Sequence, residues 1–325
     1  MKRLLFLGLA LAGLLSLTAF LISLYRSWRL YILAPEPGTT LVYHFSLYIP
    51  DNRNSFFEGI LRGAELAAAE LDSAVSVHSI DPAKNELEFA AFTGVDGVIV
   101  CPYLDDALAR RQLEKLRESE IPSVLINHNL PSDQPWPFIG INTFDMGRRI
   151  GHILSEDSSE KIRLAVVYSN KAPGIYAERE LVEMGISASL GEGLSGPIMS
   201  FRTNLNPLDA EALLATIFRT PGIRTGSDTS EPAINTIVFT DPEDTIAAVQ
   251  TLVDMNLVGR IQIIGFGADP GVQESLRKRI ISASVVIDSE RIGYEAVRSL
   301  AALRTTGYTS ASIDTGIDII TGSTL

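Results

Sequence analysis

The chain has 325 residues, of which 46% are hydrophobic and 20% are charged, and its net charge is −12. The apolar content excludes a disordered chain. The acidic balance argues against nucleic acid as a partner, because binding a polyanion requires clustered Lys and Arg. A single cysteine, Cys101, excludes an internal disulfide framework and a zinc site built from thiolates. The length suggests two domains, or one large one.

Apolar residues are concentrated at the start of the chain. Residues 4–25 form a run of 22 residues without a charge, and residues 1–35 contain four basic side chains and no acidic one. At about 1.5 Å rise per residue, this run spans the roughly 30 Å hydrocarbon core of a bilayer. It is longer than the apolar part of a signal peptide, and residues 17–19 and 20–22 offer no good small-x-small cleavage site. We therefore expect an uncleaved single-pass membrane anchor with an extracytoplasmic body; cleavage and release of the body is the alternative.

After a linker at 35–39, short apolar runs alternate with stretches of helical periodicity. Most of the apolar runs lack polar alternation, which is typical of strands buried on both faces of a parallel sheet. The predicted strands are 41–48, 75–80, 96–101, 122–126, 137–141, 162–168, 196–201, 235–240, 261–266 and 281–287. The predicted helices are 54–72, 104–118, 144–155, 174–184, 207–219, 242–256 and 289–304.

This alternation predicts an α/β protein with parallel sheets and right-handed crossovers. About ten strands are too many for one small sheet, so we expect two α/β lobes. Three Asp-Pro pairs, at Asp81, Asp241 and Asp269, each follow a predicted strand. Each pair predicts a helix start, with Asp as the N-cap and Pro as the first helical residue. The polar stretch 222–233 is interpreted as a surface loop.

The sequence shows no pattern typical of catalysis. The motifs G-x-S-x-G, H-E-x-x-H and G-x-x-x-x-G-K-[ST] are all absent from it. The four histidines have no paired metal-binding spacing. We therefore expect no catalytic residue, no cofactor and no metal.

Candidate binding residues follow predicted strands, at the edge where ligands bind in open α/β sheets. Asn54, Phe56 and Phe57 lie in a loop after the first strand, and Phe56 is placed to stack on a ligand ring. Alternatively, Asn54 caps the helix and Phe57 joins the core. Asn127 and His128 end another strand, where a plain polar turn is the alternative.

Two further candidates lie in the second half of the chain. Arg179 lies in a predicted helix among three glutamates, so a solvated charge run is the alternative to a binding role. Asp241 is expected to cap its helix whatever else it does.

The order and spacing of these segments resemble the type I periplasmic binding proteins, in particular the ribose-binding branch. The resemblance covers nearly all of residues 40–325. The segments that carry it are NSFFEGILRGAELAAAEL, DGVIVCPYLDDAL, IPSVLINHN, FIGINTFDMGRRIGHIL, YAERE, NTIVFTDPEDTIAAV and IQIIGFG followed by ISASVVIDSERIGYEAV. The resemblance implies two Rossmann-like lobes joined by three crossovers, which close on a small solute by hinge motion. Lobe 1 would comprise residues 36–141 and 288–316, and lobe 2 residues 142–287 and 317–325.

The resemblance also implies roles for particular residues. Arg179 matches the arginine that grips the ligand, and Asn127 and His128 match an Asp-Arg pair. The three aromatic positions that face the sugar are Phe56, Phe57 and Phe266. The chain departs from the family where Gly267 replaces an aspartate that binds sugar hydroxyls and where Cys101 replaces a common asparagine. A glutamine near the third crossover is replaced by Ile287 or Asp288, and Asp288 is the candidate ligand-binding residue there.

Two functions of different classes follow from these observations. The first is a membrane-anchored, non-enzymatic solute-binding protein that presents a sugar or sugar-like ligand to an ABC-type permease. The second is a ligand-sensing subunit that docks on a two-component sensor kinase. The apolar run 4–25 favours the second somewhat, because tethering raises the effective concentration near a membrane partner. A repressor would need a helix-turn-helix where the apolar run lies.

Overall fold

The structure of the chain is a computed structural model. The residues that it describes are 16–18, 20–24, 42–50, 54–81, 84–102, 105–130, 132–157, 160–169, 175, 178–203, 212–215, 217 and 234–324.

The chain forms two compact units, residues Met1–Val42 and Tyr43–Leu325. In the first unit, residues 16–18 and 20–24 are helical and exposed. The remainder of the predicted anchor 4–25 and the linker 35–39 lie outside the described residues. Within the described ranges, no helix combines the length and the apolar character needed to cross a membrane.

In the described part of the second unit, six parallel strands form a first sheet in the order β11-β5-β4-β3-β1-β2. Strand β1 lies next to the edge strand β2, and it pairs with β2 on one side and β3 on the other. The strands are β1 (His44–Pro50), β2 (Ala74–Ile80), β3 (Gly97–Val100), β4 (Ser123–Ile126), β5 (Phe138–Gly140) and β11 (Ser312–Asp314).

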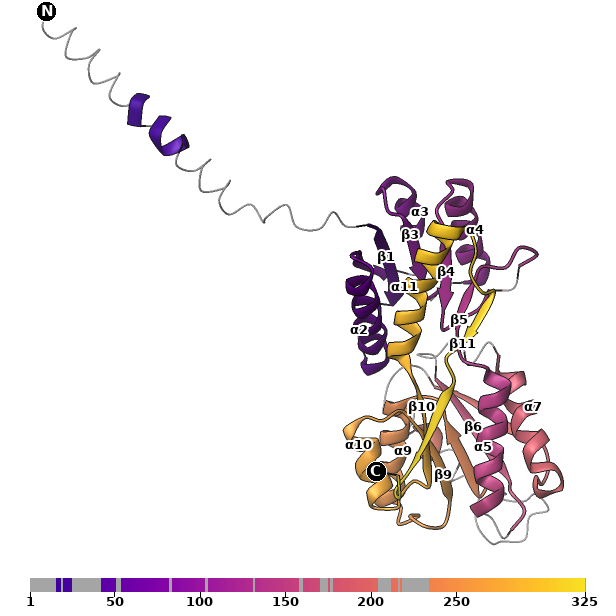
Figure 1. The fold of residues 1–325 in the computed structure, drawn as a ribbon. Coiled ribbons are helices and arrows are strands. Elements are labelled where there is room, and N and C mark those ends of the chain that lie inside the picture. Colours follow the sequence, from indigo (N-terminus) through magenta and orange to yellow (C-terminus); the bar gives the residue numbers. More distant parts are fainter. Residues whose placement is uncertain are drawn as a thin grey trace, which may run out of the picture. The chain divides into compact units, whose positions relative to one another are not determined.

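Helices cover both faces of this first sheet (Figure 1). Successive side chains of a strand point to opposite faces, so Phe45 and Leu47 pack under one helix layer while Tyr48 packs under the other. The first layer is α2 (Ser55–Glu70) and α11 (Ser289–Thr306), and the second is α3 (Glu86–Phe89), η1 (Ala90–Phe92) and α4 (Asp106–Glu118). Lobe 1 is therefore a three-layer α/β/α unit.

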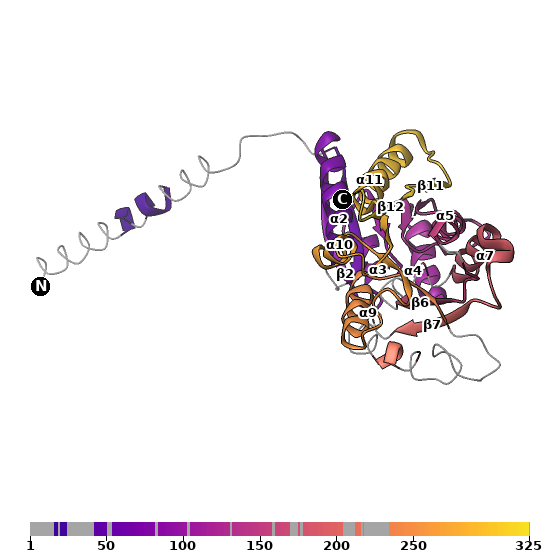
Figure 2. The same ribbon diagram turned by 90° about the horizontal axis from the view of Figure 1, so that it is seen from below.

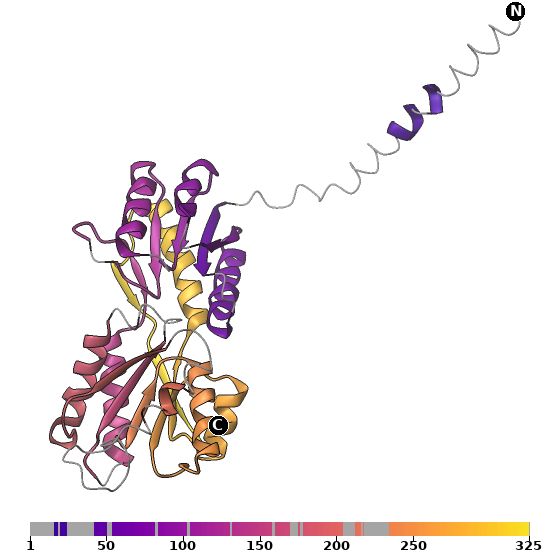
Figure 3. The ribbon, with the colours of Figure 1, turned by 180° about the vertical axis from the view of Figure 1, so that it is seen from behind.

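A second sheet has the order β12-β10-β9-β8-β6-β7 within the described residues, and its last strand β12 is antiparallel to β10. The strands are β6 (Leu164–Ser169), β7 (Met199–Thr203), β8 (Thr236–Phe239), β9 (Gln262–Phe266), β10 (Ala283–Ile287) and β12 (Ile317–Thr321). The described helices of this lobe are α5 (Thr143–Asp157), α7 (Arg179–Leu190), η2 (Gly191–Gly193), α9 (Pro242–Asp254) and α10 (Pro270–Arg277). The α5–α7 pair and the α9–α10 pair cover opposite faces of the sheet (Figure 3).

The chain passes between the two lobes near residues 140–143, 287–289 and 314–317. Hydrogen bonds join these passes: the backbone N–H of Thr315 donates to the Gly140 carbonyl at 2.8 Å, and Arg291 donates to the Thr315 carbonyl at 3.3 Å. The lobe boundaries implied by the resemblance stay predictions. This arrangement is the two-lobed α/β fold expected from the sequence.

One predicted helix start is wrong. Asp81 does not open a helix, since the next described helix, α3, begins at Glu86 with Asn85 as its N-cap residue. The Asp81 carboxylate instead pairs with the Lys84 ammonium at 2.8 Å, and its backbone N–H donates to Glu86 at 3.0 Å. These contacts tie Asp81 to Lys84 and to the first residue of α3. Pro82 and the loop 222–233 lie outside the described residues, as does most of the predicted helix 207–219, of which residues 212–215 and 217 are described.

Glycines allow close contact within two helix pairs, α2–α11 and α5–α7. A Cβ atom at Gly63 of α2 would overlap the backbone carbonyl of Glu290, and one at Gly293 of α11 would overlap the carbonyl of Ile60. Gly147 and Gly185 have the same role between α5 and α7. The views from the front and from below agree that α2 lies beside α11 and α5 beside α7 (Figures 1 and 2).

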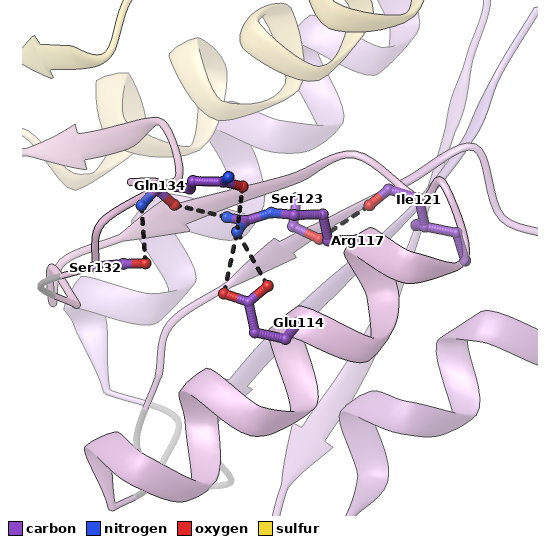
Figure 4. Close-up of polar contacts among 6 residues, drawn as sticks. All are labelled: Glu114, Arg117, Ile121, Ser123, Ser132 and Gln134. Carbon is purple, nitrogen blue, oxygen red and sulfur yellow. Dashed lines mark hydrogen bonds and ion pairs between the residues drawn. The ribbon is translucent and has the colours of Figure 1, made fainter.

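A polar cluster ties α4 to the segment that leads into β5 (Figure 4). Arg117 donates to the Glu114 carboxylate at 3.0 Å and to the backbone carbonyl of Gln134 at 2.7 Å. The same guanidinium lies over the Trp136 ring, 4.3 Å from its centroid. These contacts hold the outer helix of lobe 1 on its sheet.

The glycine contact predicts the effect of a minimal substitution. Gly63→Ala should lower the free energy of unfolding by about 2 kcal/mol, because the added methyl group forces α2 away from α11, which outweighs the better helix propensity of Ala. Urea unfolding measures this change. Gly193→Ala, where a Cβ meets nothing within 4 Å, is the matched control. An unchanged urea midpoint for Gly63→Ala would contradict the close helix contact.

Candidate functional site

A cavity of about 470 Å³ is lined by residues from both lobes. Its walls are the carboxyl ends of parallel strands and the first residues of the helices that follow them. Lobe 1 contributes Asn54, Ser55, Phe56, Asn127 and Ser289. The described lining of lobe 2 is Ile175, Thr240, Asp241, Pro242, Glu243, Ile246, Phe266, Gly267, Ala268, Asp269, Pro270, Val286 and Ile287.

In lobe 1, an asparagine cap positions an aromatic ring. The Asn54 side chain accepts a hydrogen bond from the Phe57 backbone N–H at 3.1 Å, which starts α2 directly after the loop from β1. Neighbouring residues of a helix point about 100° apart. Phe57 is therefore buried in the core, 3% exposed, while half-buried Phe56 lines the cavity. The two rings meet edge to face, with centroids 5.2 Å apart.

Asn127 lies at the end of β4 with a φ of +63°, a left-handed conformation that asparagine tolerates better than most residues. Its Nδ2 atom lies 3.9 Å from the Cys101 sulfur, at the end of the neighbouring strand β3. Its side chain thus sits at the sheet edge that faces the cavity.

In lobe 2, one threonine links two of the lining residues. Asp241 is the N-cap of α9, and its Oδ1 atom accepts from the backbone N–H groups of Glu243 and Asp244. The Thr245 hydroxyl donates to the Asp241 carbonyl at 2.8 Å and accepts from the Phe266 N–H at 3.1 Å. Buried and fully bonded, Thr245 fixes the end of β9 against the start of α9.

The predicted site residues separate into two groups. Asn54, Phe56, Asn127, Asp241 and Phe266 come together at the cavity. Phe57, His128, Arg179 and Asp288 are not among the residues that line it. Their roles at a ligand stay predictions that nothing in the structure tests.

Three of the residues outside the lining are engaged elsewhere. The buried His128 has its Nε2 atom 2.9 Å from an Asp106 carboxylate oxygen. Arg179 is the first residue of α7, and its guanidinium lies 3.5 Å from the Glu180 carboxylate. Asp288 caps α11 by accepting from the Arg291 N–H at 2.9 Å.

Sequence reasoning did not identify Asp269, Glu243 or Thr240 as cavity residues. For Asp269 the signal was present, because the Asp-Pro pair follows a strand end, but it was interpreted as a helix cap. Asp241, Glu243 and Asp269 give the described lining three carboxylates. The described lining contains no Lys, Arg or His. Across the described ranges, no group of three or more His, Cys, Asp or Glu residues could hold a metal ion.

Residues 45–307 match the family described as "Periplasmic binding protein domain". The chain belongs to this family. Together with the fold of the solved structures below, the match confirms the resemblance to the type I periplasmic binding proteins. No curated protein matches the chain.

Solved structures of the same fold include several sugar-binding proteins. A glucose-galactose binding protein, GanP, from Geobacillus stearothermophilus is 22% identical with a TM-score of 0.73, and the match covers 87% of this chain and 98% of that one. A myo-inositol binding protein from Caulobacter is 19% identical with a TM-score of 0.72, covering 90% and 96%. A periplasmic ribose ABC transporter protein from Conexibacter woesei is 19% identical with a TM-score of 0.71, covering 88% and 95%.

The burial of Cys101 beside the site predicts its reactivity. Burial raises the pKa of the Cys101 thiol to about 12, an effect that the hydrogen bond from Asn127 only partly offsets. Because the thiolate is the reactive form, iodoacetamide at pH 8 should leave the folded protein unmodified and alkylate it fully in urea. Mass spectrometry measures both states. Equal labelling rates in the folded and unfolded states would contradict the buried position.

Proposed function

We propose that the chain is an extracytoplasmic solute-binding protein whose two lobes close by hinge motion on one sugar or sugar-like molecule and present it to an ABC-type permease. The observation that carries this proposal is the cavity of about 470 Å³ lined by both lobes in a member of the periplasmic binding protein family. Its volume lies within the range of roughly 300–1,000 Å³ that small-molecule sites occupy.

The lining chemistry supports a ring-shaped polar ligand. Phe56 in lobe 1 and Phe266 in lobe 2 offer aromatic surfaces for the apolar faces of a sugar ring. Asn54 and Asn127 can donate and accept hydrogen bonds, and Asp241 can accept them from hydroxyl groups. Groups from both lobes would therefore contact one bound molecule, which links ligand binding to closure. The proposal includes no catalytic step.

The apolar run 4–25 supports a location at the cell membrane, with the body on the extracytoplasmic side. In this proposal the run is an uncleaved single-pass anchor. Cleavage within it would instead release the body as a secreted or periplasmic protein. The family to which the chain belongs supports the extracytoplasmic location of the body in either form.

A sensor kinase replaces the permease in the alternative function. The uncharged N-terminal run favours this partner, because a tethered binding protein remains close to a membrane receptor while a shuttle to a permease can diffuse freely. Cross-linking in native membranes distinguishes the two: permease subunits support transport, and a histidine kinase supports sensing.

Substitution of Phe56 tests the site. Among glucose, galactose, ribose and myo-inositol, at least one should raise the melting temperature of the protein, because a ligand that binds only the folded state stabilises it. Phe56→Ala should weaken that binding by about tenfold, the loss of an aromatic contact worth roughly 0.5–1.5 kcal/mol together with its buried area. Isothermal titration calorimetry measures the affinities.

The matched control is Phe92→Ala, which removes a ring that is 85% exposed and does not line the cavity. It should leave affinity unchanged. Arg179→Ala, measured alongside, tests the clamp role that the resemblance implies. Normal sugar binding by Phe56→Ala would place the ligand elsewhere and contradict the proposed site.

A further inference from the structure

Asp269 occupies a helix-cap position without acting as a cap. It is the N-cap residue of α10, yet its side chain accepts no hydrogen bond from that helix. Asp241 and Asp288, by contrast, both use Oδ1 to cap α9 and α11. Within the described part of the chain, no group donates a hydrogen bond or forms an ion pair with the Asp269 carboxylate, although the residue is half-buried at the cavity wall.

The carboxylate of Asp269 lies in the space above Gly267. An ideal Cβ atom at Gly267 would lie 3.0 Å from Asp269 Oδ2 and 2.7 Å from Pro242 Cγ. Gly267 also has a φ of +81°, which L side chains rarely adopt. A side chain at position 267 is therefore excluded. The acidic group at this part of the cavity wall is instead the carboxylate of Asp269.

The charges around the cavity favour a cation. Asp241, Glu243 and Asp269 place three carboxylates on its described lining, with no basic side chain beside them. Four helix N-termini also face the cavity, those of α2, α9, α10 and α11. Each carries about half a positive charge, which partly offsets the negative charge of the carboxylates. The side chains of Asn54, Asp241 and Asp288 already bond three of these four helix ends. The Asp269 carboxylate makes no such bond to its helix, so it stands at the cavity wall as a hydrogen-bond acceptor for a ligand.

Two aromatic rings complete the arrangement. Phe266, which is 8% exposed, precedes Gly267 directly, and Phe56 lines the cavity from lobe 1. The face of an aromatic ring attracts a cation, and this attraction adds to that of a carboxylate in a site from which water is displaced.

We infer that the ligand carries a positively charged amino group and that Asp269 binds this group, so the favoured ligand class is an amino sugar or a similar cyclic amine. This inference rests on the proposed function, because it assumes that the cavity binds a sugar-like molecule. An ammonium group would donate hydrogen bonds to the Asp269 carboxylate, while a neutral hydroxyl would form a weaker, uncharged contact.

The test compares ligands that share a ring and differ in charge. Isothermal titration calorimetry on the purified full chain in detergent micelles uses glucosamine, glucose and glucuronate, and then galactosamine, galactose and galacturonate. At least one amine should bind about tenfold tighter than its neutral counterpart, and the acids should bind weakest. Asp269→Asn keeps the side-chain shape and should remove that preference, while its melting temperature without ligand stays unchanged.

The matched control is Asp318→Asn, which removes a carboxylate from an exposed position of β12 outside the cavity. It should leave all six affinities unchanged. Neutral sugars that bind as tightly as the amines, or an amine preference that survives in Asp269→Asn, would overturn the inference while the proposed sugar-binding function stands. Failure of all six compounds to bind would overturn the inference, and the proposed function would fall with it if ribose and myo-inositol also left the melting temperature unchanged.

Discussion

Parallel strands within one sheet all end at the same edge, and this constraint brings the described cavity residues that follow the strands together. Each lobe builds its sheet from strand–helix–strand units of one hand, so the chain returns to the same edge after every helix. At this edge, the last residue of each strand therefore lies close to the N-cap and the first turn of the helix that follows. Asn54, Asn127, Asp241 and Phe266 are separated by up to 212 positions in sequence, yet they line one cavity for this reason.

The proposed function needs lobes that stay rigid while the junction between them bends. Inside each lobe, glycines bring helix backbones into direct contact, between α2 and α11 and between α5 and α7, and such packing leaves little room for movement. Between the lobes the chain makes three passes that hydrogen bond to one another through Thr315. The proposed hinge motion at these passes would change few backbone angles and leave both cores intact. In the proposed function, ligand contacts with both lobes would supply the energy difference that favours a closed form.

The α/β alternation, the two lobes and most element positions were predictable from the sequence, because buried parallel strands and amphipathic helices leave strong apolar patterns. The strand-end rule pointed to Asp241 and the family resemblance to Phe266, and both residues line the cavity. It could not separate Phe56 from Phe57, since a rotation of about 100° decides which ring enters the core. The acidic character of the cavity depends on Asp269, and whether an aspartate caps its helix or faces a ligand depends on tertiary contacts around Gly267 and Pro242 that no local pattern encodes. Asp81 is a second example, because its sequence pattern predicts a helix cap, whereas its carboxylate pairs with Lys84.

The central claim is that the two lobes hold a single small molecule between them and leave it chemically unchanged. A crystal structure of the protein with its tightest-binding sugar tests this claim most directly. The predicted result is an intact ligand in contact with Phe56 and Asn127 from lobe 1 and with Asp241 and Phe266 from lobe 2 at the same time. A ligand held by one lobe alone, or a converted product in the cavity, would contradict the account.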